Sequence, residues 1–473
     1  MIRRAGWVLI VIAAIACKER KEPAPYVAPG SGSGSAAPSE AGRLFTEAEI
    51  TALLDDLTKR LEATAKRTCP APQIAAAPVT GTSAELLVEL FEGTGGLAEC
   101  TKRLGELAKT DLATAVKAKA PDVMAFDTEC GGKLAARVID AAARTDGCSP
   151  YQVGVKTEPK EMVKAIRVAH VVALHARELA AKGEVAAALD LSTSALRVYQ
   201  DLARGHVTYI TAMIASASTE IIAASTDTIL DGAKLAPEAR AKVAARLDAL
   251  ATGMPRFADI QAGERDSMDI HFGAAQLMPD TWTPPGGWAD ELHPRTSGKD
   301  SFPTKRFGHP RDEAAVLLAM TVETAADQTR ACPTTATYAE CQAGLAKLAS
   351  EPTPAPEEDL GKLYAGLAVA AKAGDVESAR KQIRGSIVSI LKAIAQPAVA
   401  KYAGKLALSL ARLAELRIHV EALGTCDPGK LAAFASPPLL GAPVDVKVTG
   451  TAVEVRPPAW ADDKKVWTFA CSP

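Results

Sequence analysis

The stretch MVKAIRVAHVVALHARELAAKGEVAAALDLSTSALRVYQDLAR, residues 162–204, decides the fold class of this chain. Ala and Leu dominate its apolar positions, and both residues are strong helix formers. The pattern predicts one helix over residues 162–182 and a second over residues 184–204, because Gly183 interrupts the helical pattern between them. The sequence therefore predicts a hairpin of two long helices.

This hairpin resembles a single tetratricopeptide unit. Five residues fall near the positions that this family uses for its tight turn and for contacts between its helices: Gly183, Ala188, Leu189, Ala195 and Leu196. A weaker match covers residues 363–391, with its turn at Gly374 and Asp375. True arrays repeat about every 34 residues, and these two turns lie far more than one repeat apart. The resemblance therefore implies isolated helical hairpins and no superhelical array.

Helical patterns also fill most of the chain on either side of the hairpin. Thr46 and Glu49 fit a capping box, which predicts a helix start directly after Phe45, and this helix is expected to end at Cys69. Further helices are predicted over residues 83–92, 97–119, 132–145, 206–230, 237–251, 255–278, 311–331, 335–350, 358–373, 376–395 and 398–423.

The C-terminal segment changes to the two-residue period of a β-strand. Valines alternate from Val444 to Val448 and again from Val453, and aromatic residues alternate from Trp467 onward. Gly450 is expected at the hairpin turn. The predicted fold class is therefore mainly α, with a multi-helix body of antiparallel hairpins or a bundle and a small C-terminal antiparallel β tail.

Composition excludes two classes of protein. The chain has 473 residues, of which 48% are hydrophobic and 23% are charged, and its formal net charge is −2. A disordered chain would have lower hydrophobicity and a higher net charge. A nucleic-acid-binding protein would usually show a basic excess, so no nucleic-acid partner is expected.

The first seventeen residues predict export and a lipid anchor. Arg3 and Arg4 precede an apolar run that is too short to span a membrane, which is typical of a secretory signal peptide. The run ends in Ala14-Ile15-Ala16-Cys17, which resembles the lipobox of bacterial lipoproteins. This resemblance implies cleavage before Cys17 and acylation of Cys17 with fatty acids.

Residues 18–43 are expected to form a flexible tether, because they are rich in Pro, Gly and Ser. In the lipoprotein family an aspartate after the cysteine often retains the protein at the inner membrane. This chain has Lys18 at that position, so the resemblance favours the outer membrane of a cell envelope. An ordinary signal peptide or a short uncleaved anchor is the alternative interpretation.

The remaining eight cysteines predict disulfides, since an even number in an exported chain usually pairs. They are Cys69, Cys100, Cys130, Cys148, Cys332, Cys341, Cys426 and Cys471. We expect Cys426 to pair with Cys471 and Cys332 with Cys341. A predicted helix separates Cys130 from Cys148, and a bond between them would need both flanks of this helix to fold back, so pairing of each with Cys69 or Cys100 is favoured. No C-x₂-C spacing is present, and no metal site is predicted.

The sequence offers few candidates for chemistry, and no cofactor is predicted. Glu264 and His271 fall on one face of a predicted helix, and such a pair could do acid–base work in a desolvated pocket. A hydrogen-bonded or solvated helix face is the simpler explanation. No serine-hydrolase, metalloprotease or phosphate-binding motif occurs.

Residues 279–311 are rich in proline and predict a long loop that carries four aromatic side chains. They are Trp282, Trp288, Phe302 and Phe307. These rings could form a recognition surface, or they could hold the loop against a helical body that is poor in aromatic residues.

Together these patterns predict five regions: a signal peptide (1–16), the lipidated cysteine and tether (17–43), a disulfide-bearing helical region (44–150), the main helical body (151–424) and a disulfide-closed β tail (425–473). The expected function is that of an envelope lipoprotein, bound to a membrane through its lipid, which acts as a non-enzymatic scaffold for an unknown protein partner. The alternative is an envelope hydrolase or ligand-binding protein that uses residues 257–311.

Overall fold

The structure is a computed structural model that describes residues 46–107, 111–156, 162–270, 325–350, 375–462 and 464–472. For residues 376–398 it describes the backbone alone. All of these residues belong to one compact unit, Gly42–Pro473. Several predictions lie outside the described residues: the lipobox, the tether, the loop at 279–311, the helix over 358–373, most of the helix over 311–331, and the turn at Gly374.

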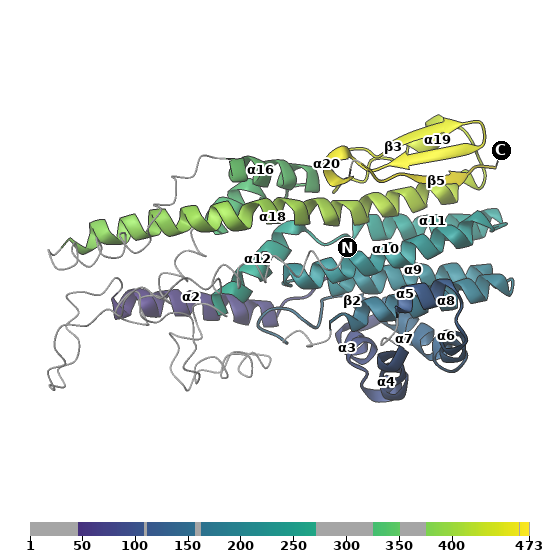
Figure 1. Ribbon diagram of the computed structural model, residues 1–473, viewed down its shortest axis with the longest axis horizontal. Helices are drawn as coiled ribbons and strands as arrows, with labels where there is room; N and C mark the ends of the chain where they lie inside the picture. Colours follow the sequence, from purple (N-terminus) through teal and green to yellow (C-terminus); the bar gives the residue numbers. More distant parts are fainter. Residues whose placement is uncertain are drawn as a thin grey trace. The chain divides into compact units, whose positions relative to one another are not determined.

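The helical hairpin at the centre of the chain is confirmed. Helix α8 (Lys164–Ala181) and helix α9 (Val185–Leu202) pack against each other. Gly183 between them has φ +86°, a left-handed backbone conformation that glycine adopts at little cost. Helix α10 (Tyr209–Asp231) packs against both helices, and its N-terminus is capped by the side chain of Thr208. These three helices form the centre of the body (Figure 1).

Helix α18 (Val376–Ala422) differs from the prediction, because a single helix of 47 residues replaces the two expected on either side of Pro397. A proline inside a helix removes one backbone hydrogen bond and usually marks a break. Helix α18 nevertheless continues, and it packs against α10, α11 (Pro237–Thr252) and α16 (Tyr338–Ser350). Figure 1 shows it as the long green helix. Tertiary packing on three partners outweighs the local signal of the proline.

The N-terminal region contains shorter helices than the pattern predicted. Helix α2 (Glu47–Ala65) starts at the expected capping box of Thr46 and Glu49. Helix α3 (Ala84–Glu92) ends at Gly93, which has φ +75°. The single helix expected over residues 97–119 is wrong: α4 (Ala98–Leu107) and α5 (Leu112–Lys117) are separate, because Asp111 caps a new helix start.

A continuous stretch from Pro121 to Ala142 follows. It consists of α6 (Pro121–Phe126), a π-helical turn η2 (Asp127–Gly131) and α7 (Gly132–Ala142). The predicted helix over residues 132–145 therefore belongs to a longer helical segment. Two short strands were not predicted: β1 (Val79–Thr82) pairs in parallel with β2 (Arg144–Asp146). Neither strand has the alternation of buried and exposed residues by which a strand is recognised in a sequence.

The C-terminal β tail is confirmed as a three-stranded antiparallel sheet. Strand β4 (Ala452–Arg456) lies between β3 (Asp445–Thr449) and β5 (Trp467–Ala470). Gly450 has φ +64° at the turn that joins β3 to β4. Strand β5 and the short helices α19 (Pro428–Ala432) and α20 (Ala459–Asp462) contact α18, so one face of the tail is buried on the long helix (Figure 1).

One hydrophobic core joins the regions that the sequence suggested. It includes Leu87 and Phe91 of α3, side chains of α8, α9 and α10, and Val453 and Val455 of β4. Helix α12 (Phe257–Met268) contributes Phe257 and Ile260. Among the described helices, none combines the length and the apolar character that crossing a membrane requires.

The prediction of disulfides is confirmed. The bonds Cys332–Cys341 and Cys426–Cys471 are the two that the sequence suggested. The four N-terminal cysteines form Cys69–Cys148 and Cys100–Cys130, so each of Cys130 and Cys148 pairs with a cysteine outside the 130–148 segment, as expected.

Candidate functional site

Glu264, the one described member of the predicted acid–base pair, stabilises the start of a helix. One carboxylate oxygen, Oε2, accepts a hydrogen bond of 2.8 Å from the backbone N–H of Tyr209, the first residue of α10. A carboxylate at this position satisfies a free N–H group and interacts favourably with the helix dipole. His271, the other member of the pair, lies outside the described residues, as do Trp282, Trp288, Phe302, Phe307 and Cys17.

Next to Glu264, the described end of α12 contributes to a buried ionic cluster. Asp266 and Asp269 are fully buried. Arg60 of α2 forms ion pairs with both carboxylates, at 2.8 Å from Oδ2 of Asp269. Arg265 Nε lies 3.0 Å from Oδ1 of Asp266. These contacts hold α2 against α12 over a sequence distance of about 200 residues.

His206 completes this cluster. Its Nε2–H donates to Oδ2 of Asp266 across 2.7 Å. The pKa of His206 is lowered to about 3, chiefly by burial and in addition by the positive charges of Arg67, Arg265 and Arg60. The two arginines that bind Asp266 already compensate its charge, so His206 is neutral in the folded protein at physiological pH.

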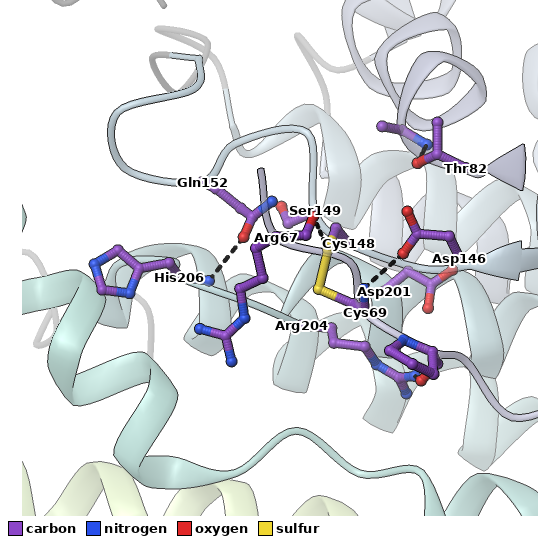
Figure 2. The surroundings of a disulfide bond; sticks show 12 residues. Arg67, Cys69, Thr82, Asp146, Cys148, Ser149, Gln152, Asp201, Arg204 and His206 are labelled. Carbon is purple, nitrogen blue, oxygen red and sulfur yellow. Dashed lines mark hydrogen bonds between the residues drawn. A yellow bond between two sulfur atoms is a disulfide. The ribbon is translucent and has the colours of Figure 1, made fainter. Parts of the chain in front are cut away.

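A second group of polar contacts surrounds the disulfide Cys69–Cys148, which Figure 2 shows. The backbone N–H of Cys69 donates to Oδ1 of Asp146 at 2.8 Å, and the N–H of Gly147 donates to the carbonyl of Cys69 at 3.0 Å. On the other side of the disulfide, the N–H of His206 donates to Oε1 of Gln152 at 3.1 Å (Figure 2). The bond thus fixes the loop after α2 onto the loop after β2.

A buried carboxylate, Asp201 of α9, lies close to this junction. It forms an ion pair with Arg197 and accepts a hydrogen bond of 3.0 Å from the hydroxyl of Ser83. Burial raises the pKa of Asp201, against the opposing effect of Arg197 and Arg204. Arg204 in turn donates to the carbonyl of Pro70 at 3.1 Å. Asp201 and Arg204 thus belong to a structural network that fixes the loop around Pro70, next to the disulfide.

The third polar centre lies between α10 and α18, and we call it the α10–α18 cluster. Its central cation is Arg412, whose side chain is 3% exposed. Nη1 donates to Oε2 of Glu415 at 2.7 Å, and Nη2 donates to Oδ2 of Asp227. Glu220 Oε2 lies 3.7 Å from Nε of the same arginine.

Glu415 and His419 complete the α10–α18 cluster. Nδ1 of His419 lies 3.0 Å from Oδ1 of Asp227, and Nε2 lies 3.4 Å from Oδ1 of Asp231. Glu415 is fully buried, and its Oε1 accepts no hydrogen bond from the described residues. Burial raises the pKa of Glu415, although Arg412 opposes this effect.

The β tail covers the α10–α18 cluster. Alternate side chains of the segment that contains β5 lie over it, as the two-residue period of a strand requires. Lys465 Nζ binds Oε1 of Glu220 at 2.7 Å. The Trp467 ring lies 5.2 Å from the Arg412 guanidinium, and the Phe469 ring stacks on His419 with centroids 4.1 Å apart. The disulfide Cys426–Cys471 closes the tail one step further along.

Sequence reasoning did not identify the α10–α18 cluster as a site. A signal was present, because Arg412, Glu415 and His419 are spaced by three and four residues on a helix that is otherwise rich in Ala and Leu. Such spacing places the three side chains on one face. Asp227 interrupts the apolar pattern of α10 in the same way. Only the structure shows that Asp227 of α10 lies next to these three residues of α18.

Chemically, the described clusters combine carboxylates, arginines and histidines whose main contacts are with each other. No family model matches this chain, and no curated protein or solved structure matches it either. Fold and site therefore define the class in physical terms: a disulfide-bonded helical body, closed at its C-terminus by a β tail that lies on a buried charge cluster.

The low pKa of His206 predicts a stability that falls in acid. The unfolded state takes up a proton near pH 6.5 and the folded state near pH 3, so unfolding becomes more favourable as the pH falls below 6.5. Between pH 7.5 and pH 5 this residue should lower the free energy of unfolding by about 2 kcal/mol. Urea denaturation at the two pH values, followed by circular dichroism, measures the change.

The variant His206→Gln provides the matched control, since the amide can still donate to Asp266 but does not titrate. Its loss of stability over the same pH interval should be smaller by about 2 kcal/mol. An identical loss in both proteins would show that His206 does not carry this pH dependence.

Proposed function

We propose that this protein is a lipid-anchored envelope lipoprotein. In this proposal its signal peptide is removed, Cys17 carries fatty acyl chains, and residues 18–43 connect the anchor to the folded body. Two or more acyl chains give stable membrane attachment, since each buried CH₂ group contributes about 0.8 kcal/mol. The outer membrane is the favoured location, because Lys18 follows the cysteine.

The pairing of the cysteines is the observation that carries the proposal. Eight of the nine cysteines form four disulfides, and the ninth is Cys17 at the lipobox-like sequence. Disulfides form and persist in oxidising compartments such as the periplasm or the cell exterior. Every cysteine except Cys17 forms a disulfide, and this pairing supports export of the chain. Cys17, the one that remains, is the residue that lipidation requires.

We further propose that the folded body acts as a non-enzymatic scaffold that binds another protein. The contacts of its charged side chains support this role. Glu264 caps α10, Asp266 binds Arg60 of α2, and Asp201 accepts a hydrogen bond from Ser83, so these carboxylates hold distant segments together. Groups engaged in this way stabilise the fold. The alternative is a hydrolase or ligand-binding protein that uses residues 257–311, and it gains no support from Glu264, whose carboxylate caps α10.

The anchor is tested on the protein purified from membranes of cells that express the full chain. Intact-mass and N-terminal peptide mass spectrometry should find Cys17 as the first residue, with a mass increase that corresponds to acyl chains. The variant Cys17→Ser should move the protein from the membrane fraction to the soluble fraction. An unmodified Cys17, or cleavage at another residue, would overturn the proposed anchor.

The scaffold role is tested by crosslinking in cells, followed by mass spectrometric identification of the crosslinked peptides. We expect one envelope protein to crosslink reproducibly to the body. Replacing Trp282 and Trp288 together by Ala should reduce this crosslink several-fold, because aromatic side chains often dominate interfaces. The double variant Trp460→Ala and Val466→Ala, in the β tail, is the control. Absence of any reproducible partner would contradict the scaffold role.

A further inference from the structure

The α10–α18 cluster has an unusual balance of charge. Four carboxylates, those of Glu220, Asp227, Asp231 and Glu415, surround two cations, Arg412 and Lys465. With a neutral His419 the cluster has two more negative than positive charges. Buried charges are normally compensated by pairing or by a bound metal ion. Asp231 is 57% exposed and Glu220 is 37% exposed, so solvent compensates much of their charge. The more buried part of the cluster, Asp227 and Glu415 around Arg412, has one negative charge more than it has positive charges.

The contacts of Arg412 leave one oxygen of each central carboxylate free of arginine. Arg412 binds Oδ2 of Asp227 and Oε2 of Glu415, which leaves Oδ1 and Oε1. Oε1 of Glu415 is fully buried and accepts no hydrogen bond from any described residue. A carboxylate oxygen in this position costs free energy unless a proton or a cation compensates it.

Donor atoms of Asp227, Glu415 and His419 lie within 4.8 Å of one another. Zinc bonds to nitrogen and oxygen ligands are about 2.0–2.2 Å long, which places two donors on one ion no more than about 4.4 Å apart, so the three side chains need only a small adjustment to bind one ion. Glu415 and His419 are four residues apart on α18, and Asp227 projects from the neighbouring α10. Helical proteins commonly build metal sites in this way, from side chains on facing helices.

Two further contacts have the form of an outer shell. Oδ1 of Asp231 lies 3.4 Å from Nε2 of His419, and Nε2 makes no hydrogen bond with the described residues. A rotation of the exposed Asp231 side chain would let it accept the second ring N–H that a ligating histidine almost always donates. Arg412 holds the outer oxygens of both carboxylates, and Phe469 stacks on the imidazole ring. The ring is thus fixed in orientation before any ion arrives.

The other group of potential ligands in the described residues does not compete with this one. It consists of Cys69, Asp146 and Cys148, and its two sulfur atoms are joined in a disulfide. All described cysteines are paired, so thiolates are excluded as ligands among these residues. The remaining donor set of one imidazole and two carboxylates suits zinc or manganese better than a soft ion.

We propose that Asp227, Glu415 and His419 bind one divalent transition-metal ion, with zinc as the best fit, and that this ion joins α10 to α18 beneath the β tail. When the ion binds, the ring proton of the neutral His419 moves from Nδ1 to Nε2 by exchange with solvent, so that no net proton is released, and the ion takes the place of the Nδ1–H···Oδ1 contact with Asp227. The role is structural, because the β tail covers the site.

The test uses the full-length protein, without a histidine tag, in detergent. After treatment with EDTA and dialysis against ZnCl₂ or MnCl₂, elemental analysis should find one ion per chain. The melting temperature of the EDTA-treated protein should rise by several degrees when stoichiometric ZnCl₂ is added, because a ligand that binds the folded state alone stabilises it. Glu415→Gln should abolish both effects.

Glu415 is buried, so its replacement could prevent folding, and a second variant is needed. The side chain of Asp231 is 57% exposed, and Asp231→Asn should fold normally while weakening zinc affinity about tenfold, as is typical for an outer-shell residue. Asp248→Asn is the matched control. The Asp248 side chain is 55% exposed, and it contacts Arg417 of α18, the helix that also carries His419. This control should bind zinc as the unaltered protein does.

Two outcomes would overturn the proposal. One is the absence of a stoichiometric ion together with an unchanged melting temperature, which would mean that a proton shared by Glu415 and Asp227 compensates the cluster. The other is zinc binding that Asp231→Asn and Glu415→Gln leave unaltered, which would locate the ion elsewhere on the chain.

Discussion

Burying a charged side chain is costly unless an opposite charge or a hydrogen-bond partner accompanies it, and this constraint determines how the segments of the protein meet. Arg60 on α2 binds Asp266 and Asp269, about 200 residues later in the chain. Arg412 on α18 binds Asp227 on α10, 185 residues earlier in the chain. The apolar core of Ala, Leu and Val side chains drives collapse. These ionic contacts select which segments lie together, since a wrong pairing would leave a buried charge without compensation.

Much of the fold was predictable because its local signals agree with its tertiary contacts. The hairpin at Gly183, the capping box at Thr46 and Glu49, and the alternation of Trp467, Phe469 and Cys471 all have clear sequence patterns, and the structure contains each element. The helix through Pro397 was not predictable, because packing along α18 outweighs a local signal. The parallel pair β1 and β2 was not predictable either, since strands of three or four residues leave too short a pattern.

The sites were less predictable than the fold, for a different reason. Glu264 and Asp266 are two residues apart, yet one caps α10 and the other joins an ionic cluster with Arg60 and His206. Sequence spacing identifies the face of a helix on which a residue lies, but not the element that packs against that face. Asp227 and Glu415 lie on helices that each look simply apolar with a few charges, and their proximity depends on the register between α10 and α18.

The central claim is that paired buried charges, and not only apolar packing, hold distant segments together. A double-mutant cycle on Asp227→Asn and Arg412→Met tests it most directly, with free energies of unfolding measured in urea and in the presence of EDTA. Arg412→Met should lose about 3 kcal/mol, because it leaves the buried carboxylates of Glu415 and Asp227 without their cation. Asp227→Asn should lose less, about 1–2 kcal/mol, because Glu415 still pairs with Arg412. The double variant should lose at least about 1 kcal/mol less than the sum of the two. Strictly additive losses would contradict the claim.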